Sequence, residues 1–224
     1  MTTSNLSLET SIQSIDQQVE ILEMIQQLRP KNNLTEEENE IVGTYTFLND
    51  AELSKSLKFF KQLQLGWIYL ENLYIDYEEL TQSYNSCEWI PIYEDSDKGS
   101  QSYAEIETPV FIKKQIPLAF YHLSSFLKIH ANATVGKHSH EVGRNTVLLI
   151  PFKGEQKTVP LEFWKDENNL LSTVIVDRPT IINTNILHAI QKTSDQERTN
   201  YNLNFNFPFT FASVSDILVN RMGL

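Results

Sequence analysis

The sequence predicts an α+β protein in which a helical N-terminal region precedes a strand-rich sandwich or barrel. Apolar residues recur at helical spacing from Leu8 to Leu28. After Pro117 the apolar segments become short, and polar or proline-bearing turns separate them, which is typical of strands. Near residue 200 apolar and polar residues alternate one by one, which is the period of a β-strand.

Three helices are expected before Gly66. The first has one apolar stripe, formed by Ile12, Ile15, Val19, Leu22, Met24, Ile25 and Leu28. Thr35 and Glu38 form a capping-box pattern that opens a second, short helix. Asp50 is expected to cap a third, whose apolar series is Leu53, Leu57, Phe59, Phe60 and Leu63.

A strand over Trp67–Leu73 and a helix over Asp76–Tyr84 complete a mainly helical region, residues 1–85, which we expect to pack on the core in one compact unit. The core, residues 86–224, begins with a polar stretch over 93–108 that predicts a loop. The strands expected after it are Phe120–Ala131, Thr146–Phe152, Leu161–Trp164, Ser172–Val176, Thr180–Asn183, Ala189–Lys192 and Thr199–Phe207.

Charge and composition narrow the function classes. The 224 residues carry 18 Lys and Arg against 29 Asp and Glu, a formal net charge of −11. Such a surface repels nucleic acid and anionic membranes, so we expect neither as a partner. A single cysteine, Cys87, forms no internal disulfide, and there is no signal-peptide pattern or long apolar run. We therefore expect a soluble cytoplasmic protein.

The last expected strand has two unlike faces. Tyr201, Leu203, Phe205 and Phe207 alternate with Asn200, Asn202, Asn204 and Asn206. An amide-lined face is unusual against solvent and suits the wall of a polar pocket.

The histidines carry the chemical signal. His138 and His140 are two positions apart, so on an extended strand both imidazoles face the same side and are able to share one metal ion. Imidazole suits zinc, copper, iron and nickel, so the pair does not choose among them. Two surface or hydrogen-bonded histidines explain such a pair equally well.

A third histidine and an arginine follow. His188 starts a strand after the turn at Asn183–Asn185, where a capping or core role is the alternative. Arg198 shares its parity with Asn200, so its guanidinium is expected on the amide-lined face, where it suits bidentate binding of a carboxylate. The alternative for Arg198 is a surface ion pair with Glu197 or another nearby acid.

This order of residues, a His-x-(Asp/Glu/other) pair, a distal histidine and an arginine ten positions later, resembles the Fe(II)/2-oxoglutarate-dependent dioxygenases over residues 120–210. Within them it looks most like the aspartyl/asparaginyl β-hydroxylase branch. The resemblance implies a double-stranded β-helix core, of the jelly-roll or cupin-like kind, with Fe(II) at its mouth. His138 and His188 would then be metal ligands and catalytic, and Arg198, with Asn200 beside it, would bind the distal carboxylate of 2-oxoglutarate.

Two further residues are expected near the cosubstrate. Arg144 lies near the position where β-hydroxylase relatives carry a second arginine. His130, with Lys128 and Asn132, shares one parity of the preceding strand and is expected to line the same pocket. Solvent contact or structural hydrogen bonding is the alternative for these side chains.

The sequence departs from the family at one position. Most members have Asp or Glu two residues after the first histidine, whereas this chain has His140. The β-hydroxylase branch lacks that carboxylate, so three candidates remain for the third ligand: His140, which is favoured by its parity, Glu141, or water.

The resemblance implies O2 as a reactant and hydroxylation of an amino acid, a peptide or protein side chain or a small metabolite, with release of succinate and CO2. The negative surface favours a neutral or cationic substrate. One alternative is a metal-binding cupin that does not use 2-oxoglutarate, although its usual glutamate would fall at Arg144 or Asn145. The other is a non-catalytic barrel that binds a protein partner. The oligomeric state is not encoded in any recognisable pattern.

Overall fold

The computed structural model describes residues 8–46, 48–93, 100–140, 145–153, 159–190, 197–206 and 208–224. The chain separates into two units, Met1–Leu65 and Gly66–Leu224. No helix in these described stretches has both the length and the apolar composition that a membrane crossing needs.

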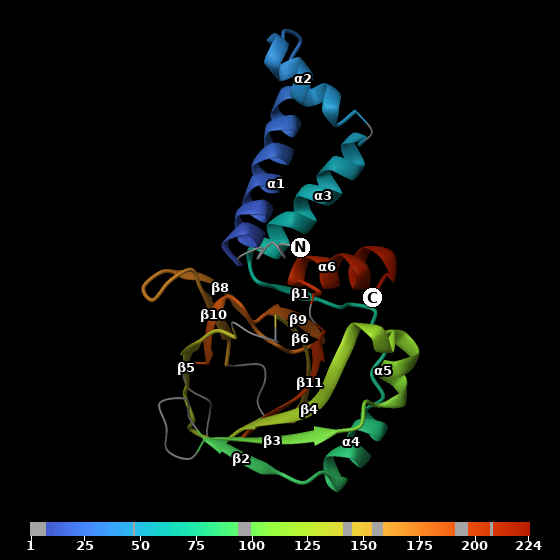
Figure 1. Cartoon of the computed structure of the whole chain (residues 1–224), viewed down its shortest axis with the longest axis vertical. Helices are drawn as coiled ribbons and strands as arrows, with labels where there is room; N and C mark the ends of the chain where they lie inside the picture. Colours follow the sequence, from blue (N-terminus) through green and yellow to red (C-terminus); the bar gives the residue numbers. More distant parts are fainter. Residues whose placement is uncertain are drawn as a thin grey trace, which may run out of the picture. The chain divides into compact units, whose positions relative to one another are not determined.

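The first unit contains three helices, α1 (Leu8–Leu28), α2 (Glu36–Thr44) and α3 (Asp50–Gln64) (Figure 1). The capping box expected at α2 is confirmed, since Thr35 accepts a hydrogen bond from the Glu38 amide and the Glu38 carboxylate accepts one from the Thr35 amide. The cap of α3 is Asn49, with Glu52 completing the box, whereas Asp50 is the first helical residue. The apolar stripes of α1 and α3 meet in a small core formed by Val19, Leu22, Ile25, Leu53 and Leu57.

The second unit begins at Gly66, whose φ of +83° favours glycine. β1 (Trp67–Tyr69) follows at once and pairs with β9 (Thr180–Asn183), so the chain joins the sheet well before residue 85, where the sequence predicted the division.

The other elements of the second unit are, in chain order, α4 (Tyr77–Ser86), β2 (Ile90–Tyr93), β3 (Gln101–Ile106), α5 (Val110–Gln115), the 3₁₀ turn η1 (Leu118–Phe120), β4 (Tyr121–Ile129), β5 (Val135–His138), β6 (Thr146–Lys153), β7 (Leu161–Trp164), β8 (Leu170–Val174), β10 (Leu187–Ile190), β11 (Arg198–Phe205), α6 (Phe211–Ser215) and the π-helical segment η2 (Asp216–Arg221).

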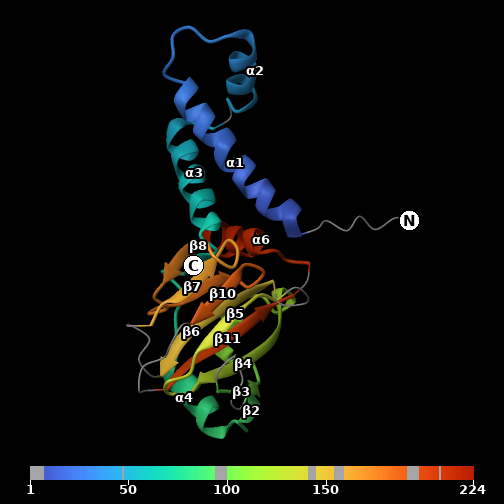
Figure 2. The ribbon, with the colours of Figure 1, turned by 90° about the vertical axis from the view of Figure 1, so that its left-hand side faces the viewer.

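The strands form two sheets in which every pairing is antiparallel. The larger sheet has seven strands in the order β1-β9-β6-β11-β4-β3-β2, and the smaller has four in the order β5-β10-β7-β8 (Figures 1 and 2). From β4 onward the chain passes repeatedly between them: β4, β6, β9 and β11 belong to the larger sheet, and β5, β7, β8 and β10 belong to the smaller.

The larger sheet is covered on both faces. Its inner face, which we define as the face carrying Ile129, Val147 and Leu149, shares one apolar core with side chains of the smaller sheet, among them Val135, Leu161, Phe163, Val174 and Ile190. On its outer face Phe126 packs against Tyr84 of α4 and against Tyr201, with ring centroids 5.4 and 6.0 Å apart. Polar groups on either face therefore need partners inside the protein or from a ligand.

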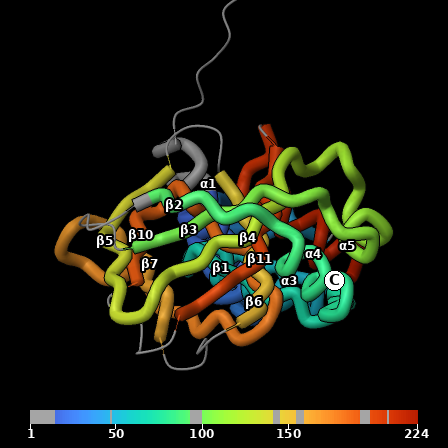
Figure 3. Tube along the Cα trace, turned by 90° about the horizontal axis from the view of Figure 1, so that it is seen from below, coloured from blue at the N-terminus to red at the C-terminus, as the bar shows by residue number. Residues whose placement is uncertain are grey.

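The expectation of a loop over 93–108 is wrong in part. β3 occupies Gln101–Ile106 and joins β4, and β2 is added outside it (Figure 3). Residues 94–99 lie outside the described part of the chain. Polar side chains hide the apolar–polar alternation of β3 in the sequence. The segment is a strand because it pairs with β4, not because of its local composition.

Candidate metal and cosubstrate site

The pairing of β5 with β10 brings two of the predicted ligands together. His138 and His188 are direct partners in this antiparallel pair. Side chains at directly opposite positions project to the same face of a sheet, with Cβ atoms about 5 Å apart. The centroids of the two imidazole rings are 4.3 Å apart.

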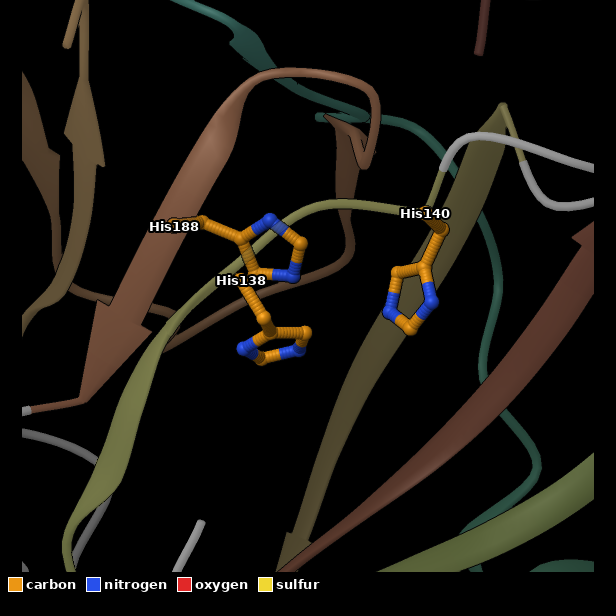
Figure 4. Close-up of side chains that lie close together, drawn as sticks. All are labelled: His138, His140 and His188. Carbon is orange, nitrogen blue, oxygen red and sulfur yellow. The ribbon is translucent and has the colours of Figure 1, made fainter. Parts of the chain in front are cut away.

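His140 completes the group from the segment that follows β5. Its backbone amide donates to the carbonyl of Thr184 at 2.8 Å, which holds this segment against the end of β9. Its ring centroid lies 5.1 Å from that of His138 and 5.5 Å from that of His188. One ring nitrogen from each of the three histidines lies within 4.8 Å of the others, and the rings surround a shared space (Figure 4).

Hydrogen bonds fix the tautomers of two of these rings. The Nδ1 atoms of His138 and His188 donate to the carbonyls of Gly136 and Ile186, at 2.9 and 2.8 Å. A carbonyl only accepts, so Nδ1 carries the proton and Nε2 keeps the lone pair that a metal ion needs. Burial, reinforced by His138 and then His140, lowers the pKa of His188 to about 3, so this ring is neutral at physiological pH.

Arg198 occupies the first position of β11 and is 2% exposed. Its Nη1 atom donates to the carbonyl of Val159 at 3.2 Å, whereas its buried Nε atom has no partner among the described residues. Burial lowers the pKa of Arg198 to about 10, so the side chain still carries its charge at neutral pH. The alternative of an ion pair with Glu197 is wrong, because the Glu197 carboxylate faces Lys128 at 3.8 Å.

No carboxylate in the described part of the chain pairs with Arg198. A buried cation without an anion is costly to a folded protein. An anionic ligand would remove that cost.

One cavity of about 590 Å³ joins these groups. The three histidines and Arg198 line it, together with Asn200, Asn202 and Asn204 of β11. The buried amide oxygens of Asn200 and Asn202 have no hydrogen-bond partner. The prediction that the amide face of this strand lines a polar pocket is confirmed, and the unpartnered polar atoms indicate that the pocket is built for a ligand.

His130 does not join the site, and the prediction that it lines the pocket is wrong. Its Nε2 atom lies 2.8 Å from the Ser102 hydroxyl. The cavity-lining residues of β4 have the other parity, Ser125, Leu127 and Ile129. Lys128 accordingly lies on the outer face, with its Nζ 4.1 Å from the ring centroid of Trp89. The register of β4 with β11 sets this parity, since Arg198 is paired with Ile129 and not with His130.

Two other candidates lie outside the described residues. Arg144, expected near the cosubstrate, and Glu141, one candidate for the third ligand, both fall in the range 141–144. Their places in the site therefore stay predictions.

Sequence reasoning missed the part of the cavity wall that β2 and β3 provide. Gln101 and Tyr103 line the cavity although residues 93–108 were expected to be a loop, and Ile92, just before that range, lines it as well. The signal that marks them is the shared parity of Gln101 and Tyr103, which becomes informative once the strand is recognised.

The chemistry of the donor set suits a transition metal. Three imidazoles, two of them with Nε2 available, match the preferences of iron, zinc, copper or nickel. Three protein ligands leave coordination positions open, as a catalytic metal site requires.

Comparison of the sequence with family models and with curated proteins finds no match. Similar solved structures do exist. The non-heme α-ketoglutarate-dependent epimerase SnoN of nogalamycin biosynthesis superposes with a TM-score of 0.52 at 10% identity, over 68% of this chain and 81% of SnoN. That likeness is one of fold alone.

Two further structures superpose with a TM-score of 0.49 each. HygX from Streptomyces hygroscopicus, solved with nickel and 2-oxoglutarate, is 10% identical over 73% of this chain and 89% of its own. A prolyl hydroxylase from Trichoplax adhaerens, solved with a peptide fragment of hypoxia inducible factor, is 12% identical over 71% of this chain and 94% of its own. The structural neighbours of this chain thus include enzymes of the 2-oxoglutarate–Fe(II) oxygenase superfamily.

Proposed function

We propose that the protein is an Fe(II)- and 2-oxoglutarate-dependent oxygenase that hydroxylates an amino acid, a peptide or protein side chain or a small metabolite. One observation carries the proposal. Three clustered imidazoles line the same cavity as a buried guanidinium that no carboxylate of the described residues pairs with, although these groups come from separate segments of the sequence. The narrower resemblance to the aspartyl/asparaginyl β-hydroxylase branch stays a prediction.

The strand order supports the fold in which such a site is expected. Eight successive strands, β4 to β11, are distributed over two facing antiparallel sheets. We infer a double-stranded β-helix, or jelly roll, with β1, β2 and β3 added to the edges of the larger sheet. In this arrangement β5 and β10 hold the histidines opposite one another, and β11 carries Arg198 along the facing sheet.

In this mechanism the imidazoles of His138, His188 and His140 hold the metal. Their carbonyl partners keep the rings of His138 and His188 in the tautomer that presents Nε2. Arg198 would bind the distal carboxylate of 2-oxoglutarate, an anion that no described residue supplies to it, and Asn200, which lines the cavity, would donate to that carboxylate from its amide nitrogen. When bound, the iron and 2-oxoglutarate supply the oxidising chemistry that consumes O2 and releases succinate and CO2.

The apolar core around the cavity has a role as well. Val147, Leu149 and Leu161 line the cavity beside the polar groups. Such walls exclude bulk water and strengthen the charged contact between Arg198 and a carboxylate.

Arg198 separates this proposal from the alternatives. A metal-binding cupin that does not use 2-oxoglutarate would need the histidines but no buried guanidinium. A non-catalytic barrel would need neither, and its histidines would be silent on mutation. The buried, unpaired Nε of Arg198 favours the oxygenase.

Anaerobic titration of the Fe(II)-loaded protein with 2-oxoglutarate tests the proposal, and a visible metal-to-ligand charge-transfer band is expected. Arg198→Met should weaken 2-oxoglutarate binding roughly 10- to 100-fold, because hydrogen bonds to charged groups contribute about 1.5–3 kcal/mol. Its affinity for the metal should change little.

Lys128→Met is the matched control, because Lys128 is a cation on the outer face of the neighbouring strand. Metal binding without the band would favour the cupin. Absence of metal binding would exclude both metal-dependent readings.

A further inference from the structure

The cavity extends sideways from the metal and cosubstrate groups along the larger sheet. Asn200 on β11 pairs with Leu127 on β4, Leu127 pairs with Tyr103 on β3, and Tyr103 pairs with Ile90 on β2. Leu127, Tyr103 and Ile92 line the cavity, so its wall continues from Arg198's strand to the edge of the sheet.

This extension provides room for a second molecule. A volume of about 590 Å³ is typical of pockets that enclose drug-sized ligands, and it is much larger than a five-carbon diacid requires. With 2-oxoglutarate held between the histidines and Arg198, the part of the cavity beside β2, β3 and β4 stays available.

The described residues that form the wall of this part carry no charge. We call it the side wall and define it as the cavity-lining residues of β2, β3 and β4: Ile92, Gln101, Tyr103, Ser125, Leu127 and Ile129. Histidines aside, Arg198 is the single charged side chain among the described residues that line the cavity. The side wall thus combines apolar surface with one hydroxyl, one amide and one phenol.

We propose that the side wall binds the substrate through an uncharged portion, which has an apolar surface and at least one hydrogen-bonding group, and excludes charged groups. This inference rests on the proposed function, because it assigns the remaining space to the substrate. A charged group entering the cavity would lose its hydration and find no counter-ion on the side wall.

Apolar surface continues outward from the side wall along β2. Ile90 and Ile92 are 59% and 42% exposed, and Ile90 lies next to Tyr103 on β3. They extend apolar surface from the side wall toward the solvent, where a further part of the substrate can pack.

Surface charge and side wall make opposite predictions for cations. A net charge of −11 raises the concentration of cations near the protein, as it would for any ligand that stays at the surface. The side wall disfavours binding of cations and anions alike. The affinities of matched charged and uncharged probes therefore show whether the surface charge or the side wall determines binding.

The test uses the full chain loaded with Zn(II) and 2-oxoglutarate, and measures dissociation constants by saturation-transfer NMR. The probes are N-acetyl-L-amino acid α-amides in two pairs of similar size. Uncharged glutamine is paired with charged glutamate, and uncharged norleucine is paired with charged lysine. Each uncharged probe should bind about tenfold or more tightly than its charged partner, because the charged group is buried without a partner.

Substitutions in the side wall test whether the probes bind there. Tyr103→Ala should weaken binding of the uncharged probes by about fivefold or more, because it removes an aromatic contact surface. Ser102→Ala on the opposite face of β3 is its control, since Ser102 contacts His130 away from the cavity. Ile92→Lys, at a half-exposed position that tolerates the change, should raise the affinity for the glutamate probe by about tenfold.

Equal binding within each pair, no binding of any probe, or equal losses in Tyr103→Ala and Ser102→Ala would overturn the side-wall proposal. The proposed function is tested separately by 2-oxoglutarate binding in wild type and in Arg198→Met. If 2-oxoglutarate does not bind while the probes keep their preference and their dependence on Tyr103, the side wall is supported and the cosubstrate assignment is wrong.

Discussion

The two faces of β11 differ in how their polar groups are satisfied. On the outer face the Tyr201 hydroxyl lies 3.0 Å from the Ser124 hydroxyl, and its ring packs against Phe126. On the inner face Arg198 and Asn202 keep buried polar atoms without partners. We propose that a ligand in the cavity satisfies these inner-face atoms.

The contrast shows how a strand face that lines a cavity can differ from a face that packs in the core when both are buried. Exposure does not separate them, since Arg198 is 2% and Tyr201 0% exposed. The hydrogen-bond partners of these two side chains do differ, since the Tyr201 hydroxyl lies 3.0 Å from that of Ser124, whereas Arg198 Nε has no partner among the described residues.

The largest expected effect on stability is on the outer face. Phe126 is fully buried and packs against the rings of Tyr84, Phe152 and Tyr201. Phe126→Ala should lower the free energy of unfolding by about 3–5 kcal/mol, since it removes a large side chain from a packed core. Urea unfolding followed by tryptophan fluorescence measures this in the second unit, because all three tryptophans belong to residues 66–224.

A smaller change of opposite sign is expected for Arg198→Met. Removing an unpaired buried cation should raise the free energy of unfolding of the metal-free protein by about 1–3 kcal/mol, although the Val159 carbonyl loses a hydrogen bond. The same urea experiment checks it, with Lys128→Met as the control. A clear loss of stability would show that Arg198 is a structural residue and would remove the contrast between the faces.

Asn202→Ala should have the smallest effect. Its amide oxygen has no partner in the described structure, so its removal should change the free energy of unfolding by no more than about 1 kcal/mol. Ser124→Ala on the outer face is the comparison, because it breaks the contact with Tyr201 and leaves that hydroxyl buried. If Asn202→Ala is the more destabilising of the two, the inner face does not differ from the outer in the proposed way.

Local sequence patterns predicted much of the site. The alternation after Arg198 placed Asn200, Asn202 and Asn204 on one face, and the structure confirms that all three line the cavity. Strand parity also placed His138 and His140 together, and both contribute ring nitrogens to the cluster. These predictions depend on neighbours a few residues apart, which the period of a strand determines.

What the sequence did not predict depends on pairing between distant segments. His130 was assigned to the pocket by parity within its own strand, but the register with Arg198 turns Ile129 inward instead. The chain then turns through Asn132, whose φ is +59°, so the parity of β4 does not continue into β5. β3 was missed for the same reason, since its partner strand and not its composition makes it a strand.

Metal and cosubstrate are proposed to share one cavity, and calorimetric titration of 2-oxoglutarate with and without bound Zn(II) tests this most directly. Ligands that share a site are coupled reciprocally, so bound metal should tighten 2-oxoglutarate binding by about tenfold or more. His188→Ala should abolish that difference. The account would be contradicted if the affinity for 2-oxoglutarate did not depend on the metal. It would also be contradicted if bound metal tightened 2-oxoglutarate binding as much in His188→Ala as in wild type.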